Sequence, residues 1–389
     1  MSFEEESQRD SRAEFLEPGS CGSGLSRRLL DVPGGYLWWY VDLIDARGNG
    51  LVVIWSFGLP FLPGYIDAVR RGRGQKPRHR PSLNVCTYRG GALDFYLLQE
   101  FGSDEVQWRT RERGEEWRYG ASTIRSQVCR NGWREVVLDL KLDVPGLQGP
   151  ASLELRGQGP AVRRHGGDHD PLVRRCEPLP VHDWVPLVWG HNAEGRLATG
   201  GEEQRFRGRF YHDRNGGAVA LNELGLKRWL WWRVALSGGE LVCYAFDGPR
   251  QTQYAMWSID EDGRFSYLPS VRLERRAQAT NRFGLSWWPS MSVDIAGTPW
   301  LSVEHSDVVD SGPFYLRSLL RATDRRGRSF PGVAEVCEPG RTDRNRHRPL
   351  VRMRVHRRQG ENSMWLPLFS GPRRGRVRRL LRSIFRGKR

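Results

Sequence analysis

Residues 36–57 read YLWWYVDLIDARGNGLVVIWSF. Two runs of aromatic and β-branched residues, 36–44 and 51–57, flank the turn sequence ARGNG at 46–50. Residues of these types suit the pleated, half-buried surface of a sheet, and glycine and asparagine between such runs are typical of a tight turn. The stretch therefore predicts a β-hairpin.

Short runs of the same kind continue along the chain and predict a series of further strands. The run at 135–142 alternates cleanly between its two faces, as a strand does, and 64–73 is the one plausible helical patch in the first half. The series as a whole predicts an all-β protein of two consecutive up-and-down, barrel-like units with few helices. The other expected strands are at residues 82–88, 93–99, 122–128, 204–213, 229–237, 240–246, 252–259 and 264–273.

Composition suggests where these units begin and end. Residues 1–29 are polar, with clusters of glycine and serine, and we expect them to be disordered. Residues 157–180 are rich in glycine, proline, arginine and histidine, which predicts a long loop. The length of 389 residues suits two domains of ordinary size. We therefore expect a first β domain at 30–190, a second at 191–370 and a separate tail at 371–389.

The tail carries much of the net charge of +16, because nine basic residues and no acidic residue follow Pro372. Subtracting those nine leaves a net charge of only +7. Apolar residues recur in the tail at helical spacing, with arginines on the other face, which predicts a basic amphipathic helix on an anionic membrane surface. The alternative is a disordered arginine-rich tail that binds nucleic acid or nothing. The apolar stripe favours the membrane, so no nucleic acid partner is expected; the stripe consists of Val377, Leu380, Leu381, Ile384 and Phe385.

Other features bear on the compartment. The six cysteines are scattered singly, without a CxxC pair, which argues against a zinc module and a disulfide scaffold. The N-terminus is acidic and shows no secretory signal, and no apolar run is long enough to form a transmembrane helix. We expect a cytoplasmic protein that is peripheral on the inner face of the cell membrane.

Several common catalytic motifs are missing from the sequence. It contains no GxxxxGK[ST], HExxH or GxSxG, so kinase, zinc protease and common hydrolase readings lose support. The cluster HGGDHD at 165–170 has metal-ligand residue types, but it is glycine-rich and flanked by arginines. A solvated loop is the better interpretation, and we expect no metal site.

Two short segments have the residue types of an acid–base site. The segment VHDW at 181–184 contains His182 and Trp184, and the segment GRFYHDRNGG at 208–217 contains Tyr211 and Asp213. Residues two apart on a strand point to the same face, so each pair can project into one interior, and neighbouring strands can bring the pairs together. The alternative is that such residues simply complete hydrogen bonds and caps near strand ends, and spacing alone favours this alternative.

An ordered set of segments resembles the carotenoid 1,2-hydratases, also called hydroxyneurosporene synthases. The pairs His182-x-Trp184 and Tyr211-x-Asp213 match, in order and approximate spacing, positions taken as catalytically important in that family. The resemblance runs from about residue 34 to about residue 273 and leaves out the tail after Pro372. The other similar segments are GGYLWWYVD at 34–42, residues 50–61, PGY at 63–65 and LNV at 83–85.

One departure from the family pattern concerns the second pair. The family usually reads Tyr-x-Asp-His-Asn, then a large residue and glycine. Here Arg214 stands where histidine is expected, and Gly216 stands where a bulky residue often lies. An arginine beside Asp213 would stabilise its anion and weaken an acid catalyst. Strand alternation, however, points Arg214 to the opposite face.

The resemblance implies two lipocalin-like units and a hydro-lyase that works without a redox cofactor. Such enzymes add water across the terminal C1–C2 double bond of an acyclic carotenoid of the lycopene or neurosporene type, giving a tertiary alcohol. The implied roles are proton donor for Asp213 and orientation of that acid for Tyr211. Trp184 would stabilise the cation through its π face, and His182 would position or deprotonate the water.

Two other functions remain open at this stage. The wider superfamily includes non-hydrating enzymes, so an isoprenoid or polyene cyclase is one alternative. A lipocalin-like carrier of an apolar ligand is the other. A carrier would not need Asp213, and Asp213→Asn would then leave ligand binding intact with no activity to lose.

Overall fold

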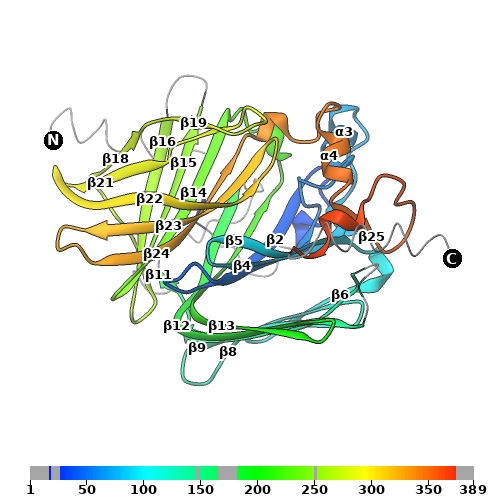
Figure 1. Cartoon of the computed structure of the whole chain (residues 1–389), viewed down its shortest axis with the longest axis horizontal. Helices are drawn as coiled ribbons and strands as arrows, with labels where there is room; N and C mark the ends of the chain where they lie inside the picture. Colours follow the sequence, from blue (N-terminus) through cyan, green and yellow to red (C-terminus); the bar gives the residue numbers. More distant parts are fainter. Residues whose placement is uncertain are drawn as a thin grey trace.

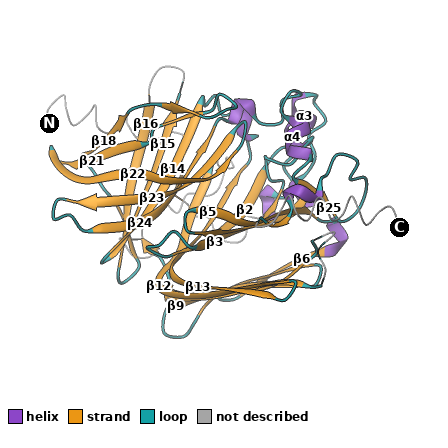
Figure 2. Ribbon diagram, viewed as in Figure 1, coloured by secondary structure: helices purple, strands orange, loops and turns teal. Residues whose placement is uncertain are grey.

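The computed structural model describes residues 17–18, 27–144, 147, 149–164, 182–248 and 252–373. Over these residues the chain is mostly strand, as expected (Figure 2). The predicted tail helix, the HGGDHD cluster and most of the segment expected to be disordered lie outside the described residues. The short helical elements are α3 (Tyr65–Arg70), α4 (Arg348–Arg352), η1 (Pro77–His79), η2 (Ser103–Glu105), η4 (Leu221–Glu223), η5 (Pro339–Arg341) and η6 (Pro367–Phe369).

The larger sheet has fourteen strands and curls on itself. Its order is β25-β5-β4-β3-β2-β13-β12-β10-β9-β8-β7-β6, with β1 beside β12 and β26 beside β5. Strands β8, β9, β12 and β13 form a layer below β2–β5 (Figure 1). Trp39 of β2 contacts Trp117 of β7 across the enclosed core, with ring centroids 4.7 Å apart. The bounds are β1 (Glu17–Pro18), β2 (Tyr36–Ile44), β3 (Gly50–Phe57), β4 (Pro81–Arg89), β5 (Ala92–Glu100), β6 (Val106–Arg111), β7 (Gly114–Tyr119), β8 (Ser122–Val128), β9 (Trp133–Leu142), β10 (Ala151–Pro160), β12 (Asp183–Thr199), β13 (Glu202–Gly217), β25 (Val355–Arg357) and β26 (Gly371–Pro372).

The smaller sheet has ten strands in the order β11-β17-β16-β15-β14-β24-β23-β22-β21-β18. It encloses a core of its own, to which Trp232 and Met256 belong. A two-stranded ribbon, β19–β20, completes the second half. The bounds are β11 (Arg163–Arg164), β14 (Arg228–Leu236), β15 (Gly239–Asp247), β16 (Thr252–Asp260), β17 (Arg264–Tyr267), β18 (Val271–Arg276), β19 (Ala279–Thr280), β20 (Ser286–Trp287), β21 (Ser290–Ile295), β22 (Thr298–Ser311), β23 (Tyr315–Asp324) and β24 (Ser329–Cys337).

A third core lies between the two sheets. Strand β14 reads RWLWWRVAL and is buried on both faces for almost its whole length, because one face packs on its own sheet's core and the other meets the larger sheet. Tyr40 of β2 and Trp231 of β14 meet in this third core at a centroid distance of 5.3 Å. Side chains that alternate along β2 and β14 therefore serve two cores at once.

The opening hairpin is confirmed, with β2 and β3 paired antiparallel from Leu37–Phe57 to Ile44–Gly50. The run at 264–273 is interrupted, because Ser270 adopts a left-handed backbone with φ of 56° and β18 pairs with β21 instead of β17. The helical patch predicted at 64–73 corresponds to the short helix α3.

The loop expected at 157–180 was wrong for its first residues, since β10 continues to Pro160 and β11 follows. The glycines there mark close packing. A Cβ on Gly157 would lie 2.8 Å from the Phe210 ring, and one on Gly159 would collide with the carbonyl oxygen of Trp189. Glycine inside a strand often marks such a close approach.

The sheets use different residue ranges from the expected domains. The expected division at residue 190 falls inside β12, and all strands of the smaller sheet except β11 follow β13. Residues 191–217 and 355–357 thus belong to the sheet of the first half. Separate folding of the two units stays a prediction.

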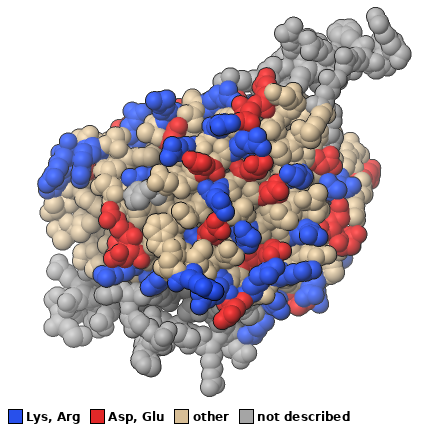
Figure 3. Space-filling model, turned by 90° about the horizontal axis from the view of Figure 1, so that it is seen from below, with Lys and Arg blue, Asp and Glu red and all other residues tan. Residues whose placement is uncertain are grey.

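Figure 3 shows the molecule from below, and basic and acidic side chains are interspersed on this face. Arg196, for example, bonds Glu154 and Glu203 on adjacent strands, each at 2.9 Å. Among the described residues, no helix is both long and apolar enough to pass through a bilayer.

Candidate active site

The structure brings the four residues of the predicted site together between the two sheets. Strands β12 and β13 are antiparallel neighbours, which places Asn215 opposite Trp184. His182 lies immediately before β12, and Tyr211 and Asp213 lie on β13 with their side chains on one face. All four are buried, with exposed fractions of 2% or less.

Three side chains donate hydrogen bonds to the carboxyl group of Asp213. Trp184 Nε1 donates to Oδ2 over 2.8 Å, and the Tyr211 hydroxyl donates to the same oxygen over 2.9 Å. Asn215 Nδ2 donates to Oδ1 over 3.0 Å. The carboxyl group is therefore fixed in orientation through both oxygens.

Two tyrosines extend this network from other strands. The Tyr244 hydroxyl of β15 donates to Asn215 Oδ1 over 3.1 Å, and the Tyr36 hydroxyl of β2 lies 2.8 Å from His182 Nδ1. Asn215 was not among the predicted site residues, although its place two residues after Asp213 on the same strand face was a usable signal. Tyr244 comes from the smaller sheet, and no local pattern points to it.

Burial gives Asp213 the properties of an acid. Loss of solvation raises its pKa to about 8; the hydrogen bonds from Trp184 and Tyr211 oppose that rise, and the charges of Glu335 and Asp42 add to it. Near neutral pH the carboxyl group is mostly protonated and can donate a proton.

His182 is set up differently. Burial lowers its pKa to about 3, so the imidazole is neutral near pH 7 and is a weak proton acceptor. Its Nε2 is buried and makes no hydrogen bond in the described part of the chain. The ring packs against Trp229 at 4.9 Å and Trp38 at 6.0 Å.

Arg214 points away from the site, as strand alternation predicts. Its Nη2 bonds Asp183 Oδ2 at 3.1 Å, and both side chains are buried on the other face of the strands. The neighbouring His212 stacks on Trp55 on that face. The arginine at position 214 is therefore directed to Asp183, on the opposite face from Asp213.

A pocket of about 440 Å³ opens between the sheets beside this network, and none of the four predicted residues lines it. Its lining includes the stacked rings of Trp38 and Trp229, whose centroids are 6.1 Å apart. Because His182 packs against both rings, the pair separates the pocket from the buried network. The volume falls within the range of pockets that hold a drug-sized ligand.

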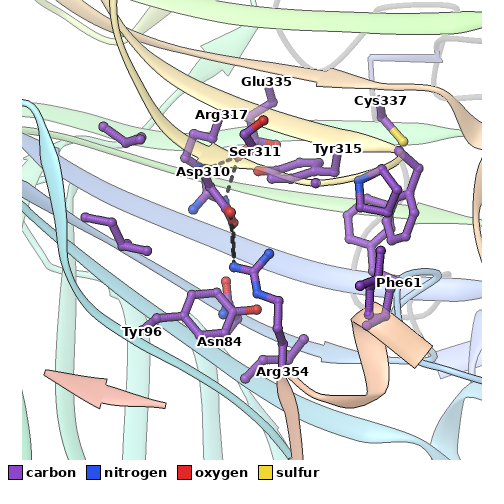
Figure 4. Close-up of a pocket in the computed structure, with 18 of the residues that line it drawn as sticks. Phe61, Asn84, Tyr96, Asp310, Ser311, Tyr315, Arg317, Glu335, Cys337 and Arg354 are labelled. Carbon is purple, nitrogen blue, oxygen red and sulfur yellow. Dashed lines mark hydrogen bonds and ion pairs between the residues drawn. The ribbon is translucent and has the colours of Figure 1, made fainter. Parts of the chain in front are cut away.

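The pocket is mainly apolar, but two ion pairs lie in its lining (Figure 4). Arg354 Nη2 bonds both oxygens of Asp310 at 3.0 and 3.1 Å. Arg317 Nε donates to Glu335 over 2.9 Å. Among the described residues, no group of three or more His, Cys, Asp or Glu side chains is placed to hold a metal ion.

Fold and site together define a lipocalin-like β protein that holds a protonated carboxyl group between two packed sheets. The family model described as carotenoid hydratase CrtC matches residues 53–364, and the chain belongs to this family.

Among its relatives, a Chlorobaculum tepidum protein named hydroxyneurosporene dehydrogenase is 25% identical over 378 residues, covering 92% of this chain and 96% of the relative. The acyclic carotenoid 1,2-hydratase of Thiocapsa roseopersicina is 28% identical over 215 residues, which is 55% of this chain and 48% of that protein. The match to this hydratase therefore spans about half of its length.

Two solved structures show the same fold at low sequence identity. A candidate AttH from Nitrosomonas europaea superposes with a TM-score of 0.52 at 14% identity, covering 79% of this chain and 93% of that one. CghA in complex with Sch210972 gives a TM-score of 0.51 at 14% identity, covering 84% and 96%.

Proposed function

We propose that the protein is an acyclic carotenoid 1,2-hydratase, which adds water to a terminal double bond by acid catalysis. The observation that carries this proposal is Asp213, a buried carboxyl group oriented by three hydrogen bonds and with its pKa raised to about 8 by burial. A protonated carboxylic acid near neutral pH is what protonation of an alkene carbon requires. Membership of the carotenoid hydratase family supports the substrate class.

The reaction begins when Asp213 transfers its proton to the less substituted carbon of the terminal double bond. The resulting tertiary cation is then captured by water, which forms the alcohol. The Trp184 ring packs against Tyr244, Trp257 and Phe265, so its main part here is to orient Asp213 through Nε1. Trp38 and Trp229 line the pocket and offer π faces that can stabilise the cation.

Access to the acid requires a rearrangement at the inner end of the pocket. Trp38 and Trp229 lie between the pocket and the network around His182. The end of the carotenoid therefore reaches Asp213 when these two rings move apart. A pocket of about 440 Å³ suits one end of a forty-carbon chain, with the remainder outside.

Incubation with lycopene-type and neurosporene-type substrates in detergent and ¹⁸O-labelled water tests the proposal. We expect a tertiary alcohol that carries one labelled oxygen, identified by mass analysis. An isomer of unchanged mass would indicate a cyclase, and bound but unaltered carotenoid would indicate a carrier. Loss of two hydrogens would instead match the reaction in the name of the Chlorobaculum relative.

The pH dependence should show the raised pKa of Asp213. Since the acid works only when protonated, we expect kcat/KM to fall as pH rises through about 8, with no corresponding loss near the ordinary carboxyl pKa of 3.8. The measurement is the rate of alcohol formation between pH 4 and pH 10. A rate that already falls between pH 4 and pH 6 would contradict a raised pKa.

A further inference from the structure

A carboxylate of the smaller sheet reaches the pocket that lies beside the Asp213 network. Glu335 lies on β24 and lines the pocket (Figure 4). Trp38 and Trp229 line the same pocket. The Glu335 side chain is 21% exposed, in contrast to Asp213 at 2%. Arg317, which is itself buried, holds Glu335 Oε1 through Nε and Nη2, each at 2.9 Å.

Glu335 is also close to the Asp213 network. It pairs with Trp231 on the neighbouring strand β14, and the Trp231 ring lies 6.0 Å from Tyr211 and 5.3 Å from Tyr40. Tyr40 in turn pairs with Asp213 in the larger sheet. Aromatic contacts between the two sheets thus connect Glu335 to the strand that carries Asp213, and the charge of Glu335 adds to the raised pKa of Asp213.

Their surroundings differ in a way that suits different tasks. Asp213 is enclosed, and only neutral groups donate hydrogen bonds to it, whereas Glu335 accepts hydrogen bonds from the Arg317 guanidinium and faces the open pocket. Two carboxyl groups in different environments, one enclosed among neutral groups and one beside a cation, are a common arrangement for an acid and a base in one site.

We propose that Glu335 is a further catalytic residue, which accepts the proton of the attacking water. This proposal rests on the proposed hydration. Asp213 gives its proton to the alkene, whose electron pair forms the new C–H bond. A water oxygen then forms the C–O bond to the cation and loses a proton to Glu335. After product release, Glu335 gives that proton to solvent and Asp213 regains one, so alkene and water balance the alcohol.

Glu335 fits this task better than the other candidates near the pocket. His182 has a pKa of about 3, which makes its imidazole a weak proton acceptor, and it does not line the pocket. Asp310 has both carboxylate oxygens bound by Arg354. Glu335 therefore combines access to the pocket with proximity to the acid.

The test compares Glu335→Gln with the full-length wild-type protein in D₂O, using a lycopene-type substrate in detergent. Without the base, the cation formed by Asp213 should lose a proton and return to an alkene, which leaves deuterium in the recovered carotenoid. We expect alcohol formation to fall by about 10²–10⁴-fold, while deuterium in the recovered substrate rises. The matched control is Glu338→Gln, because Glu338 follows the end of β24, is paired with Arg228 and Arg341, and does not line the pocket.

The outcomes separate this proposal from the proposed function. If Glu335→Gln forms alcohol at the wild-type rate, Glu335 is not the base, and the proposed hydration is unaffected. If Glu335→Gln loses both alcohol formation and deuterium incorporation, Glu335 is again not the base. If the wild-type protein gives neither product nor deuterium, the hydration itself fails. If Glu335→Gln does not fold, Glu335→Asp replaces it in the test. Aspartate keeps the negative charge, but its shorter side chain draws the carboxylate back from the pocket. An unchanged ratio of deuterated substrate to alcohol in Glu335→Asp would then overturn the proposal.

Discussion

Asp213→Asn should abolish water addition while the protein still folds and still takes up carotenoid. Asparagine keeps the size of the side chain and can still accept the bonds from Trp184 and Tyr211. It cannot donate a proton to carbon, and this step starts the whole reaction. Loss of a general acid typically costs about 10²–10⁴-fold in rate, and we expect an effect at the upper end. The measurement is product formed per mole of protein, with folding checked by circular dichroism.

Two companion variants show whether the effect belongs to the acid. Tyr211→Phe removes an orienting hydrogen bond but not the proton, so its loss of activity should be milder. Arg214→His changes the residue next to Asp213, on the opposite face. Because Arg214 bonds Asp183 there, this change should lower thermal stability more than activity. Full activity in Asp213→Asn would refute the mechanism.

The pH dependence of protein stability tests the raised pKa of Asp213 independently of activity. A pKa raised from 3.8 to about 8 means that the folded state holds the proton more tightly than the unfolded chain. The stability that protonated Asp213 contributes is fully present below its pKa of 3.8 in the unfolded chain. It is lost as the pH rises toward about 8, the pKa of Asp213 in the folded protein. Asp213→Asn removes this dependence, so the variant should resist unfolding better than the wild type at pH 8. Equal stability of the two proteins at every pH would contradict the raised pKa.

Local patterns were enough to predict the first hairpin and the face shared by Tyr211 and Asp213. Alternation along one strand fixes which residues share a face, and the turn at 46–50 joins strands that are adjacent in sequence. The same reasoning placed Arg214 on the opposite face. These features depend on neighbours in the chain, and for that reason a single sequence contains them.

The rest depended on contacts between distant segments. Glu335 comes near Asp213 through the packing of one sheet on the other, more than a hundred residues apart in sequence and beyond the resembling region. Gly157 and Gly159 suggested a loop by composition. In the structure they lie in a strand, where the lack of a side chain allows close packing of the Phe210 ring and the Trp189 backbone. Sheet order and register are set by such packing, and periodicity does not specify them.

Arg233→Met should destabilise the protein more than any exposed substitution, because it breaks a buried ion triad between the sheets. Arg233 of β14 is fully buried and bonds Asp42 of β2 and both oxygens of Glu240 of β15. Removing one partner of a buried ion pair typically costs about 3–5 kcal/mol, a large part of the roughly 5–15 kcal/mol that stabilises an ordinary domain. Urea unfolding at pH 7 measures the loss.

The triad also makes the loss depend on pH. Burial already raises the pKa of Glu240 to about 7, and without the Arg233 charge that pKa rises further, since the guanidinium opposes the shift. The variant should therefore regain stability as pH falls and Glu240 is neutralised.

Arg196→Met is the control, because its partners Glu154 and Glu203 are on the surface, and its unfolding midpoint should barely change. Equal midpoints for Arg233→Met and Arg196→Met would show that the triad does not hold the two sheets together. Recovery on replacing all three triad members with apolar residues would assign the loss to the uncompensated anions.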